Sequence, residues 1–402
     1  MTLIVKKYGG SSLSSLAKLR SIARIVHESH SYTDHKLVIV LSAMGSSTDN
    51  LVDLSKKAVK EANPRDYDML LSTGEQVSIA MLSMLINNLG GKAVPLTGWQ
   101  AGIKTDSSHT NARIKAINTK RIRAELRKSN IVIIAGFQGQ TSDNNISTLG
   151  RGGSDTTAVA LAASLKADEC QIYTDVDGVY TTDPRICPKA RRLDLLTYEE
   201  MLEMSGLGSK VLQLRSVEFA SKYNVPIRVL HAHKNQALGT LITKEEKKME
   251  GALISGIAFT KDEAEIMIKG VKDQPGVAAK ILGPIGAAKI EIDMIVQNVG
   301  SNGLADFTFT VSRNTLKNAI KVIEKNKKIM GYDSFDTKNN IVKVSLIGVG
   351  MRSHAGIASK MFKCLARNKV NIRMISTSEI KISVVIDQKN LEIAVQALHN
   401  EF

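Results

Sequence analysis

Aromatic residues are scarce in this chain, and their scarcity argues against one class of partner. Tryptophan, tyrosine and phenylalanine together make up 4% of the 402 residues. Proteins that bind single-stranded nucleic acid stack the bases on aromatic side chains. The formal net charge of +15 is compatible with nucleic acid, a membrane surface or anionic small molecules. Because the lysines are widely spread and aromatics are few, we expect no nucleic-acid partner and favour anionic small molecules.

Cysteines and long apolar runs are also few. Cys170, Cys187 and Cys364 lack metal-binding spacing, which suits a reducing compartment. His231 and His233 have no third ligand nearby, so we expect no metal site. No uninterrupted apolar run reaches the roughly 18 residues of a membrane span, and no signal or transit pattern precedes the first expected strand. We therefore expect a cytoplasmic protein without membrane association.

A glycine-rich turn that contains an arginine lies in the middle of the chain. Residues 150–155 read Gly-Arg-Gly-Gly-Ser-Asp, and an alanine-rich helix is expected from about Thr156 to Leu165. Glycines allow a ligand to approach the backbone, and a helix N-terminus attracts anions. The guanidinium of Arg151 can hold a carboxylate through two hydrogen bonds. A plain strand-to-helix turn is the alternative, but Thr174 and Asp175, which end the next expected strand, favour an anion site.

The start of the chain carries a second junction of this kind. Residues 3–5 are expected to form a buried strand, Lys7 follows it, and a helix is expected from about Leu13 to His27. Two glycines and two serines, at 9–12, separate the lysine from the helix. The pattern is not a P-loop, because G-x-x-x-x-G-K-[ST] is missing. Lys7 alone could be a solvated lysine at a strand end, but two junctions with a cation favour a phosphate site.

Strands and helices are expected to alternate up to residue 243. Besides residues 3–5, we expect strands at 36–41, 93–96, 131–135, 170–174 and 227–230. Such alternation indicates a mainly parallel sheet covered by helices. Ligands in such sheets bind beyond the carboxyl ends of the strands, where Lys7, Ser42 and Thr174 would lie. A charged segment at 244–248 reads as a solvated connector.

The last third of the chain contains a repeat. Residues 276–295 match residues 356–375 at a constant offset of 80, with seven identical pairs that include the two initial glycines. Each copy reads as a βαββαβ module. Chance similarity of two amphipathic helices is the alternative, but seven matches without a gap argue against it.

Six motifs, in order, resemble those of the aspartate kinases in the amino-acid kinase family. They are KYGGSS at 7–12, LSAMGSSTDNL at 41–51, STGEQVS at 72–78, TLGRGGSDTTA at 148–158, YTDVDGVYTTDPR at 173–185 and GLGSKVLQLRSVEFA at 206–220. The repeat resembles a tandem of ACT domains, which bind amino-acid effectors where modules pair. The resemblance covers nearly the whole chain.

The resemblance implies an α/β fold with two parts. Residues 1–245 would form the amino-acid kinase domain, a mainly parallel sheet sandwiched by helices. Residues 246–402 would form a regulatory region of two ferredoxin-like βαββαβ ACT modules, at about 264–335 and 341–402. Residues 252–260 could join the second module and make the tandem interleaved.

The resemblance also assigns roles to single residues. Lys7, Asp155 and Lys210 would be catalytic. Residues that would bind the substrate aspartate are Ser42, Thr48, Glu75, Arg151, Gly152, Gly153 and Ser154. Residues that would bind ATP are Lys7, Gly9, Gly10, Ser11, Thr174, Asp175, Tyr180, Arg185 and Lys210. Mg²⁺ would be bound mainly through the nucleotide phosphates, with no dedicated metal-binding residues.

The implied reaction transfers a phosphoryl group from ATP to the side-chain carboxylate of L-aspartate, the first step toward lysine, threonine, methionine and diaminopimelate. Lysine, threonine or both would act as feedback effectors. Residues expected at the effector site are Asp273, Gly276, Ala278, Asp293, Gln297, Asn371 and Ile372. Arg373 departs from the acidic residue common there, so the sequence leaves the effector, and inhibition itself, open.

Several alternatives remain open at this level. A kinase for another amino acid would share the fold, and a non-catalytic amino-acid sensor would share the regulatory tandem. Glu75 and Arg151 favour an unmodified amino acid, and intact Lys7 and Asp155 favour catalysis. We expect a homo-oligomer through the ACT modules, and an internal start such as Met249 could yield a separate regulatory subunit.

Overall fold

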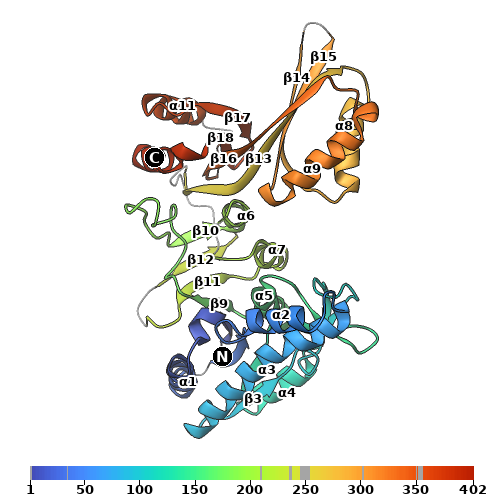
Figure 1. Cartoon of the computed structure of the whole chain (residues 1–402). Helices are drawn as coiled ribbons and strands as arrows, with labels where there is room; N and C mark the ends of the chain where they lie inside the picture. The colour runs from blue at the N-terminus through green and yellow to red at the C-terminus, as the bar shows by residue number, and fades with distance from the viewer. Residues whose placement is uncertain are drawn as a thin grey trace. The chain divides into compact units, whose positions relative to one another are not determined.

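The computed structural model describes residues 2–33, 35–208, 211–234, 238–244, 254–300, 303–349, 351 and 356–402. These residues form two compact units (Figure 1). The described parts of 1–180, 192–206 and 210–249 make up the first unit, and those of 181–191, 207–209 and 250–402 the second. Most of the expected connector at 244–248 and the candidate start Met249 lie outside the described residues.

The first unit is built on an eight-stranded sheet. Its strand order is β10-β12-β11-β9-β1-β2-β6-β3. All neighbours run parallel except β11 and β12. The bounds are β1 (Leu3–Tyr8), β2 (Lys36–Leu41), β3 (Ala93–Leu96), β6 (Ile131–Ala135), β9 (Glu169–Thr174), β10 (Leu195–Thr197), β11 (Ile227–His231) and β12 (Thr240–Thr243). This arrangement confirms the mainly parallel sheet, and every strand expected for it is present.

Helices cover both faces of this sheet. Side chains of α1 and α3 share a core with Ile4, Ile39 and Ile133, whereas α5 packs against β1, β2 and β9 on the face that carries Lys7. A smaller sheet, ordered β5-β4-β7-β8, belongs to the same unit. The remaining bounds are α1 (Leu16–Ser31), α2 (Ser47–Ala58), α3 (Pro64–Asn88), α4 (Lys120–Arg127), α5 (Gly153–Leu165), α6 (Tyr198–Gly206), α7 (Leu214–Tyr223), β4 (Ile103–Thr105), β5 (Ile114–Ile117), β7 (Gln138–Gln140) and β8 (Ile146–Thr148).

Two helix starts differ from the sequence prediction. The helix expected from Leu13 is preceded by a 3₁₀ turn, Gly10–Leu13, and α1 begins at Leu16 because the Ser15 side chain caps it by accepting a hydrogen bond from the Lys18 amide. The helix expected from Thr156 begins at Gly153, after Gly152 with a φ of 69°. That positive φ suits glycine, so α5 begins inside the glycine turn and its N-terminus lies at the turn's end.

In the part of the chain that the structure describes, one helix, α3, is long and apolar enough to cross a membrane by length and composition, with a mean hydropathy of 1.4 over its most apolar window. Its buried side chains include Asp68 and Glu75 as well as Ile79, Leu82 and Ile86, which pack in the core against α1 and the sheet. A helix that buries two acids within a protein core is best read as a core helix of the unit.

The second unit contains a six-stranded antiparallel sheet ordered β14-β15-β13-β16-β18-β17. Figure 1 shows α8 and α9 beside the half with β14 and β15, and α11 beside the half with β17 and β18. Its elements are β13 (Gly256–Lys272), α8 (Val277–Ala287), β14 (Ile292–Val299), β15 (Leu304–Val311), α9 (Arg313–Lys325), α10 (Lys327–Met330), β16 (Ser334–Ile347), α11 (Ile357–Arg367), β17 (Ile372–Thr377), β18 (Lys381–Asp387), a 3₁₀ turn (Gln388–Asn390) and α12 (Leu391–Glu401).

The repeat recurs in the structure at the same offset of 80. Helices α8 and α11 begin at Val277 and Ile357, after Gly276 and Gly356 with φ of 90° and 110°. Two strands run through both modules. Residues 256–260 of β13 pair with 343–347 of β16, and residues further along β13 pair with both β15 and the start of β16.

A segment before residue 245 packs with the second unit. Ile186 and Cys187, from 181–191, join the core cluster under α11 and α12. The Ile257 amide donates a hydrogen bond to the Thr181 carbonyl at 2.6 Å. The segment 181–191 therefore belongs to the second compact unit although it precedes residue 245, because it supplies apolar side chains to that unit's core.

Charged side chains are buried on the sheet of the second unit. The Lys343 ammonium lies 2.8 Å from the Glu263 carboxylate and also contacts Asp293. The Arg373 guanidinium donates two hydrogen bonds to Glu265, at 2.7 and 3.0 Å, and these bonds raise the pKa of Arg373. Lys343, Glu263 and Glu265 are at most 5% exposed, so these acids and bases neutralise one another inside the protein.

Candidate active site

A cavity of about 430 Å³ lies in the first unit where the predicted site residues converge. It is lined by segments that follow β1, β2 and β8 and by one face of α3. The predicted residues in its wall are Lys7, Gly10, Ser42, Thr48, Glu75, Arg151, Gly152, Gly153, Ser154 and Asp155. The structure thus brings together every residue predicted to bind the substrate.

Lys7 and Asp155 form an ion pair at the centre of this wall. The Lys7 ammonium lies 2.5 Å from the Asp155 carboxylate, and both side chains are about a tenth exposed (11% and 10%). Lys7 lies near the carboxyl end of β1, and Asp155 lies in the first turn of α5. The pair therefore joins the two glycine-rich junctions that the sequence singled out, and leaves a cation facing the cavity.

The loops after β1 and β2 pack closely against each other. The Gly45 amide donates to the Gly10 carbonyl at 2.9 Å, and a Cβ on Gly10 would lie 2.9 Å from the Ala43 carbonyl oxygen. Gly9 lies beside the Lys7 ammonium, and Ser11 is exposed. Glycine at position 10 therefore permits an approach that any side chain would prevent.

Glu75 enters the cavity from α3 with half of its carboxylate unpartnered. One oxygen accepts a hydrogen bond from the Ala43 amide at 3.1 Å, and the other is buried without a hydrogen-bond partner among the described residues. Burial raises the pKa of Glu75 to about 8. A buried acid with a free oxygen is costly unless a donor meets it, so this site is suited to an added cation.

Arg151 lies in the glycine turn before α5. Gly150 and Gly152 have φ of 75° and 69°, and a Cβ on Gly152 would overlap the Gln213 side chain. The Arg151 side chain is exposed, and no described residue forms an ion pair with it. Its guanidinium is available to a carboxylate, next to the free amides at the start of α5.

The predicted nucleotide residues that the structure describes from β9 onward lie in three places. Thr174 and Asp175 end β9 and are joined by a 3.1 Å hydrogen bond. The Tyr180 hydroxyl donates to Asp177 at 2.8 Å, which raises the pKa of Tyr180. Arg185 belongs to the second unit, where its guanidinium pairs with Asp183 at 2.8 Å. Lys210 lies outside the described residues.

Sequence reasoning missed several residues in and behind the wall. Tyr67, Leu71, Thr110, Phe137 and Thr148 also line the cavity, and Asp68 and His109 lie behind it. A signal for Asp68 was present, because positions 68, 71, 72 and 75 repeat at helical spacing and place two acids on the buried face of α3.

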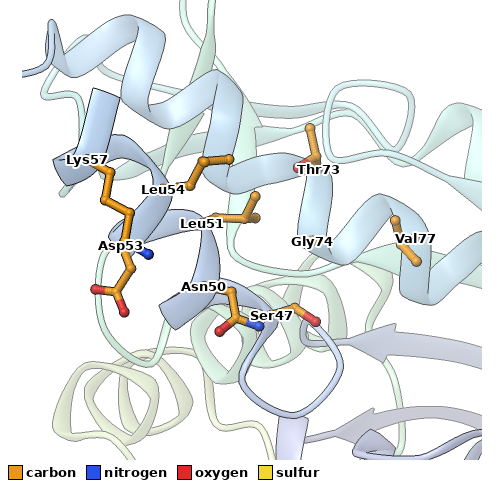
Figure 2. A pocket seen from close by; sticks show the side chains of 9 residues that line it. All are labelled: Ser47, Asn50, Leu51, Asp53, Leu54, Lys57, Thr73, Gly74 and Val77. Carbon is orange, nitrogen blue, oxygen red and sulfur yellow. The ribbon is translucent and has the colours of Figure 1, made fainter. Parts of the chain in front are cut away.

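A second hollow, of about 590 Å³, lies between α2 and α3. Figure 2 shows Leu51 and Leu54 on the side of α2 that faces Thr73, Gly74 and Val77 of α3. It is the larger of the two spaces, but its lining lacks the convergent buried charges of the first. We therefore place the candidate active site in the smaller cavity.

The predicted effector residues lie in the second unit. Gly276 caps α8 and Ala278 lies in its first turn. The Gln297 amide lies 3.5 Å from Asp273, and Asp293 contacts Lys343. Asn371 is exposed and Ile372 begins β17. Among the described residues, no three His, Cys, Asp or Glu side chains are grouped to hold a metal ion.

Comparison with known proteins agrees with this architecture. The amino acid kinase family matches residues 2–231, and ACT domains match residues 265–327 and 344–402. An aspartate kinase of Pseudomonas putida is 57% identical over 403 residues, which cover 100% of this chain and 98% of that protein. An aspartate kinase structure from Synechocystis is 39% identical with a TM-score of 0.56, covering 99% of this chain and 69% of that one.

E. coli aspartokinase III, solved in complex with aspartate and ADP, has the same fold. Its TM-score is 0.83 at 23% identity, and the match covers 100% of this chain and 99% of that one. The chain therefore belongs to the amino acid kinase family, as an aspartate kinase with two C-terminal ACT domains.

Proposed function

We propose that the cavity around Lys7 is where the chain phosphorylates the side-chain carboxylate of L-aspartate with ATP. The observation that carries this proposal is Glu75. A buried carboxylate with one unpartnered oxygen shares the cavity with the exposed Arg151 and with the Lys7–Asp155 pair. An amino acid presents one cation and one anion at its backbone end, and Glu75 and Arg151 offer a partner of opposite charge to each.

In this proposal the substrate ammonium pairs with Glu75 and its α-carboxylate with Arg151. Ser42, Thr48 and the turn at 152–154 supply the remaining polar contacts. The side-chain carboxylate then points toward Lys7. Each charge of the substrate is matched within one cavity, which favours an unmodified amino acid over an N-acylated one that lacks the ammonium.

The chemical step needs alignment and charge neutralisation and no general base. An oxygen of the aspartate side chain, already an anion, forms a bond to the γ-phosphorus. The bond from that phosphorus to the bridging oxygen of ADP breaks, and ADP leaves with the electron pair. Lys7 holds positive charge beside the transferring group, and Asp155 fixes the position of that ammonium.

The nucleotide is proposed to bind along the carboxyl ends of β1 and β9, through Gly9, Gly10 and Ser11 and through Thr174, Asp175 and Tyr180. Arg185 and Lys210 stay predictions for this site. Carboxylate and phosphate oxygens are the ligands that Mg²⁺ prefers. Asp155 is the carboxylate best placed in the cavity to support a Mg²⁺ ion held mainly by the phosphates, which would supply further neutralisation.

The product, 4-phospho-L-aspartate, would begin the route to lysine, threonine, methionine and diaminopimelate. E. coli aspartokinase III has also been solved with lysine and aspartate. We propose feedback by lysine, threonine or both at the predicted effector residues, in a homo-oligomer assembled through the ACT modules. A regulatory subunit translated from an internal start such as Met249 is a further proposal.

Measuring ADP release from MgATP with L-aspartate tests this function. We expect turnover with aspartate and none with glutamate, and inhibition by added lysine, threonine or both. Turnover with glutamate in place of aspartate would make the chain a kinase for another amino acid. Absence of turnover from folded protein that binds lysine or threonine would favour the non-catalytic sensor.

A further inference from the structure

The carboxylate of Asp68 is the centre of a buried hydrogen-bond cluster behind the candidate active site. Asp68 lies on α3 and is 0% exposed. Its oxygens accept hydrogen bonds from His109 Nδ1 at 2.8 Å, from the Thr110 amide at 3.0 and 3.1 Å, and from the Thr148 hydroxyl at 2.5 Å. A buried carboxylate needs such donors, and all of them come from two segments that line the cavity.

The first of these segments has an unusual backbone at the cavity. Thr110 has a φ of 66°, a strained left-handed conformation that a β-branched residue rarely adopts. Its amide is the group that donates to both oxygens of Asp68, so the carboxylate stabilises the strained conformation. The exposed Thr110 lies in the cavity wall.

The second segment leads directly into the turn that carries Arg151. Thr148 ends β8 two residues before Gly150, and its carbonyl accepts a hydrogen bond from the Ala112 amide at 2.9 Å. A Cβ on Gly150 would lie 3.0 Å from the Asn111 side chain and 3.2 Å from the Thr110 carbonyl. The turn therefore rests on the backbone of residues 110–111.

A side chain from α7 joins the same two segments from the other side. The Arg215 guanidinium donates to the Leu149 carbonyl and to the Ala112 carbonyl, each at 2.8 Å. Asp68 and Arg215 thus both form hydrogen bonds to the segments at 109–112 and 148–149, from opposite sides. These bonds are charge-assisted and therefore stronger than neutral hydrogen bonds. Neither side chain lines the cavity.

We propose that Asp68 is a positioning residue for the substrate end of the active site. It holds the Thr110 segment and the Gly150–Gly153 turn together, so that Arg151 presents its guanidinium to the substrate α-carboxylate. This inference rests on the role proposed for Arg151. Displacement of a binding group by about 1 Å can cost up to 10²-fold, and the loss falls on aspartate because the nucleotide residues of β9 do not contact the cluster.

The test compares Asp68→Asn with Asp66→Asn in steady-state kinetics of the full chain. The first change keeps the shape of the side chain but puts an NH₂ group where an acceptor is required. Asp66 lies two residues away on the same helix, is 62% exposed and pairs with Arg65, so it controls for the chemistry of the substitution. We expect the aspartate KM to rise on the order of 10-fold or more in Asp68→Asn, with the ATP KM within about twofold, and both unchanged in Asp66→Asn.

Equal changes in both KM values, or none, in folded Asp68→Asn would overturn the inference. If that variant does not fold, Thr148→Val decides, because it removes one hydrogen bond at nearly constant shape. It must raise the aspartate KM selectively, and unchanged aspartate KM in it would overturn the inference. Wild-type protein inactive with aspartate, or Arg151→Ala with normal aspartate KM, would instead defeat the proposed function.

Discussion

Buried charges serve different ends in the two units. In the sheet of the second unit, Lys343 meets Glu263 and Arg373 meets Glu265, and each charge is neutralised within the chain. In the cavity of the first unit, Glu75 keeps an unpartnered oxygen and Arg151 is exposed. Since a buried polar group without a partner is costly, the unpartnered oxygen of Glu75 marks a place for a ligand, whereas the paired charges of the second unit form a structural network.

The largest expected effect is the loss of stability when a buried ion pair of the second unit is broken. Lys343→Met leaves Glu263 buried without its partner and should destabilise the protein by about 3–5 kcal/mol. Thermal or denaturant unfolding measures this loss. Lys269→Met is the control on the same sheet, since Lys269 pairs with Asp336 in a solvent-exposed bridge that is expected to contribute little to stability. Similar losses in both variants would contradict the comparison.

The next largest expected effect is a fall in kcat when Lys7 is replaced, without a loss of the fold. Lys7→Ala removes the cation beside the transferring phosphoryl group, and kcat should fall by about 10²–10³, by analogy with the loss of one oxyanion donor. The protein should stay folded, because Asp155 lies in the wall of the cavity, where water can meet its carboxylate once the ammonium is gone. Wild-type kinetics in a folded Lys7→Ala protein would remove Lys7 from the active site.

Arg151→Ala should act on one substrate. We expect the aspartate KM to rise on the order of 10-fold or more, because a bidentate charge-assisted contact is lost, while the ATP KM changes little. Initial rates with each substrate varied in turn give both constants. Parallel changes in the two constants would assign Arg151 to the whole site and not to the α-carboxylate.

The pKa of Glu75 predicts a dependence of aspartate binding on pH. Below pH 8 the unliganded carboxyl is mostly protonated, and only its ionised form attracts an ammonium. The aspartate KM should therefore fall by up to about tenfold per pH unit as pH rises toward 8 and then level off. Glu75→Gln should remove this slope, and a slope that persists in it would point to another group.

The raised pKa of Glu75 also makes the stability of the folded protein depend on pH. The pKa of Glu75 in the folded protein, about 8, lies above the ordinary value of 4.5. Between these two pH values the folded protein therefore keeps a proton on Glu75 that the unfolded chain releases. The contribution of Glu75 is complete below pH 4.5 and is lost as pH rises through 8. Unfolding of wild-type and Glu75→Gln protein across this range compares the two slopes.

Local sequence patterns were enough to predict much of the fold and part of the candidate site. The strands of the parallel sheet, the repeat and the glycine turns follow from apolar runs, residue spacing and φ requirements that neighbouring residues settle. Lys7, Ser42 and Arg151 could be predicted because each lies in or next to a strand-to-helix junction. Such junctions have a known position at the edge of a parallel sheet.

The rest depends on contacts between residues far apart in the sequence. Asp68 accepts hydrogen bonds from residues 41, 42 and 80 positions away, and no short motif records such partners. Arg185 lies in a motif predicted to bind the nucleotide, yet its segment belongs to the second unit, where Cys187 is buried and Ile186 packs against the same core cluster. Helix starts were misplaced by about three residues where a serine cap or a left-handed glycine decided them.

The ion pairs of the second unit give the duplicated modules a preference for each other. At the offset of 80, Glu263 corresponds to Lys343 and Asp293 to Arg373, so the first module carries acids where the second carries bases. If a module met a copy of itself at this contact, like charges would face each other, acid against acid or base against base. Like-charge contacts of this kind penalise wrong partners, so the opposite charges at matching positions favour pairing of the two unlike modules.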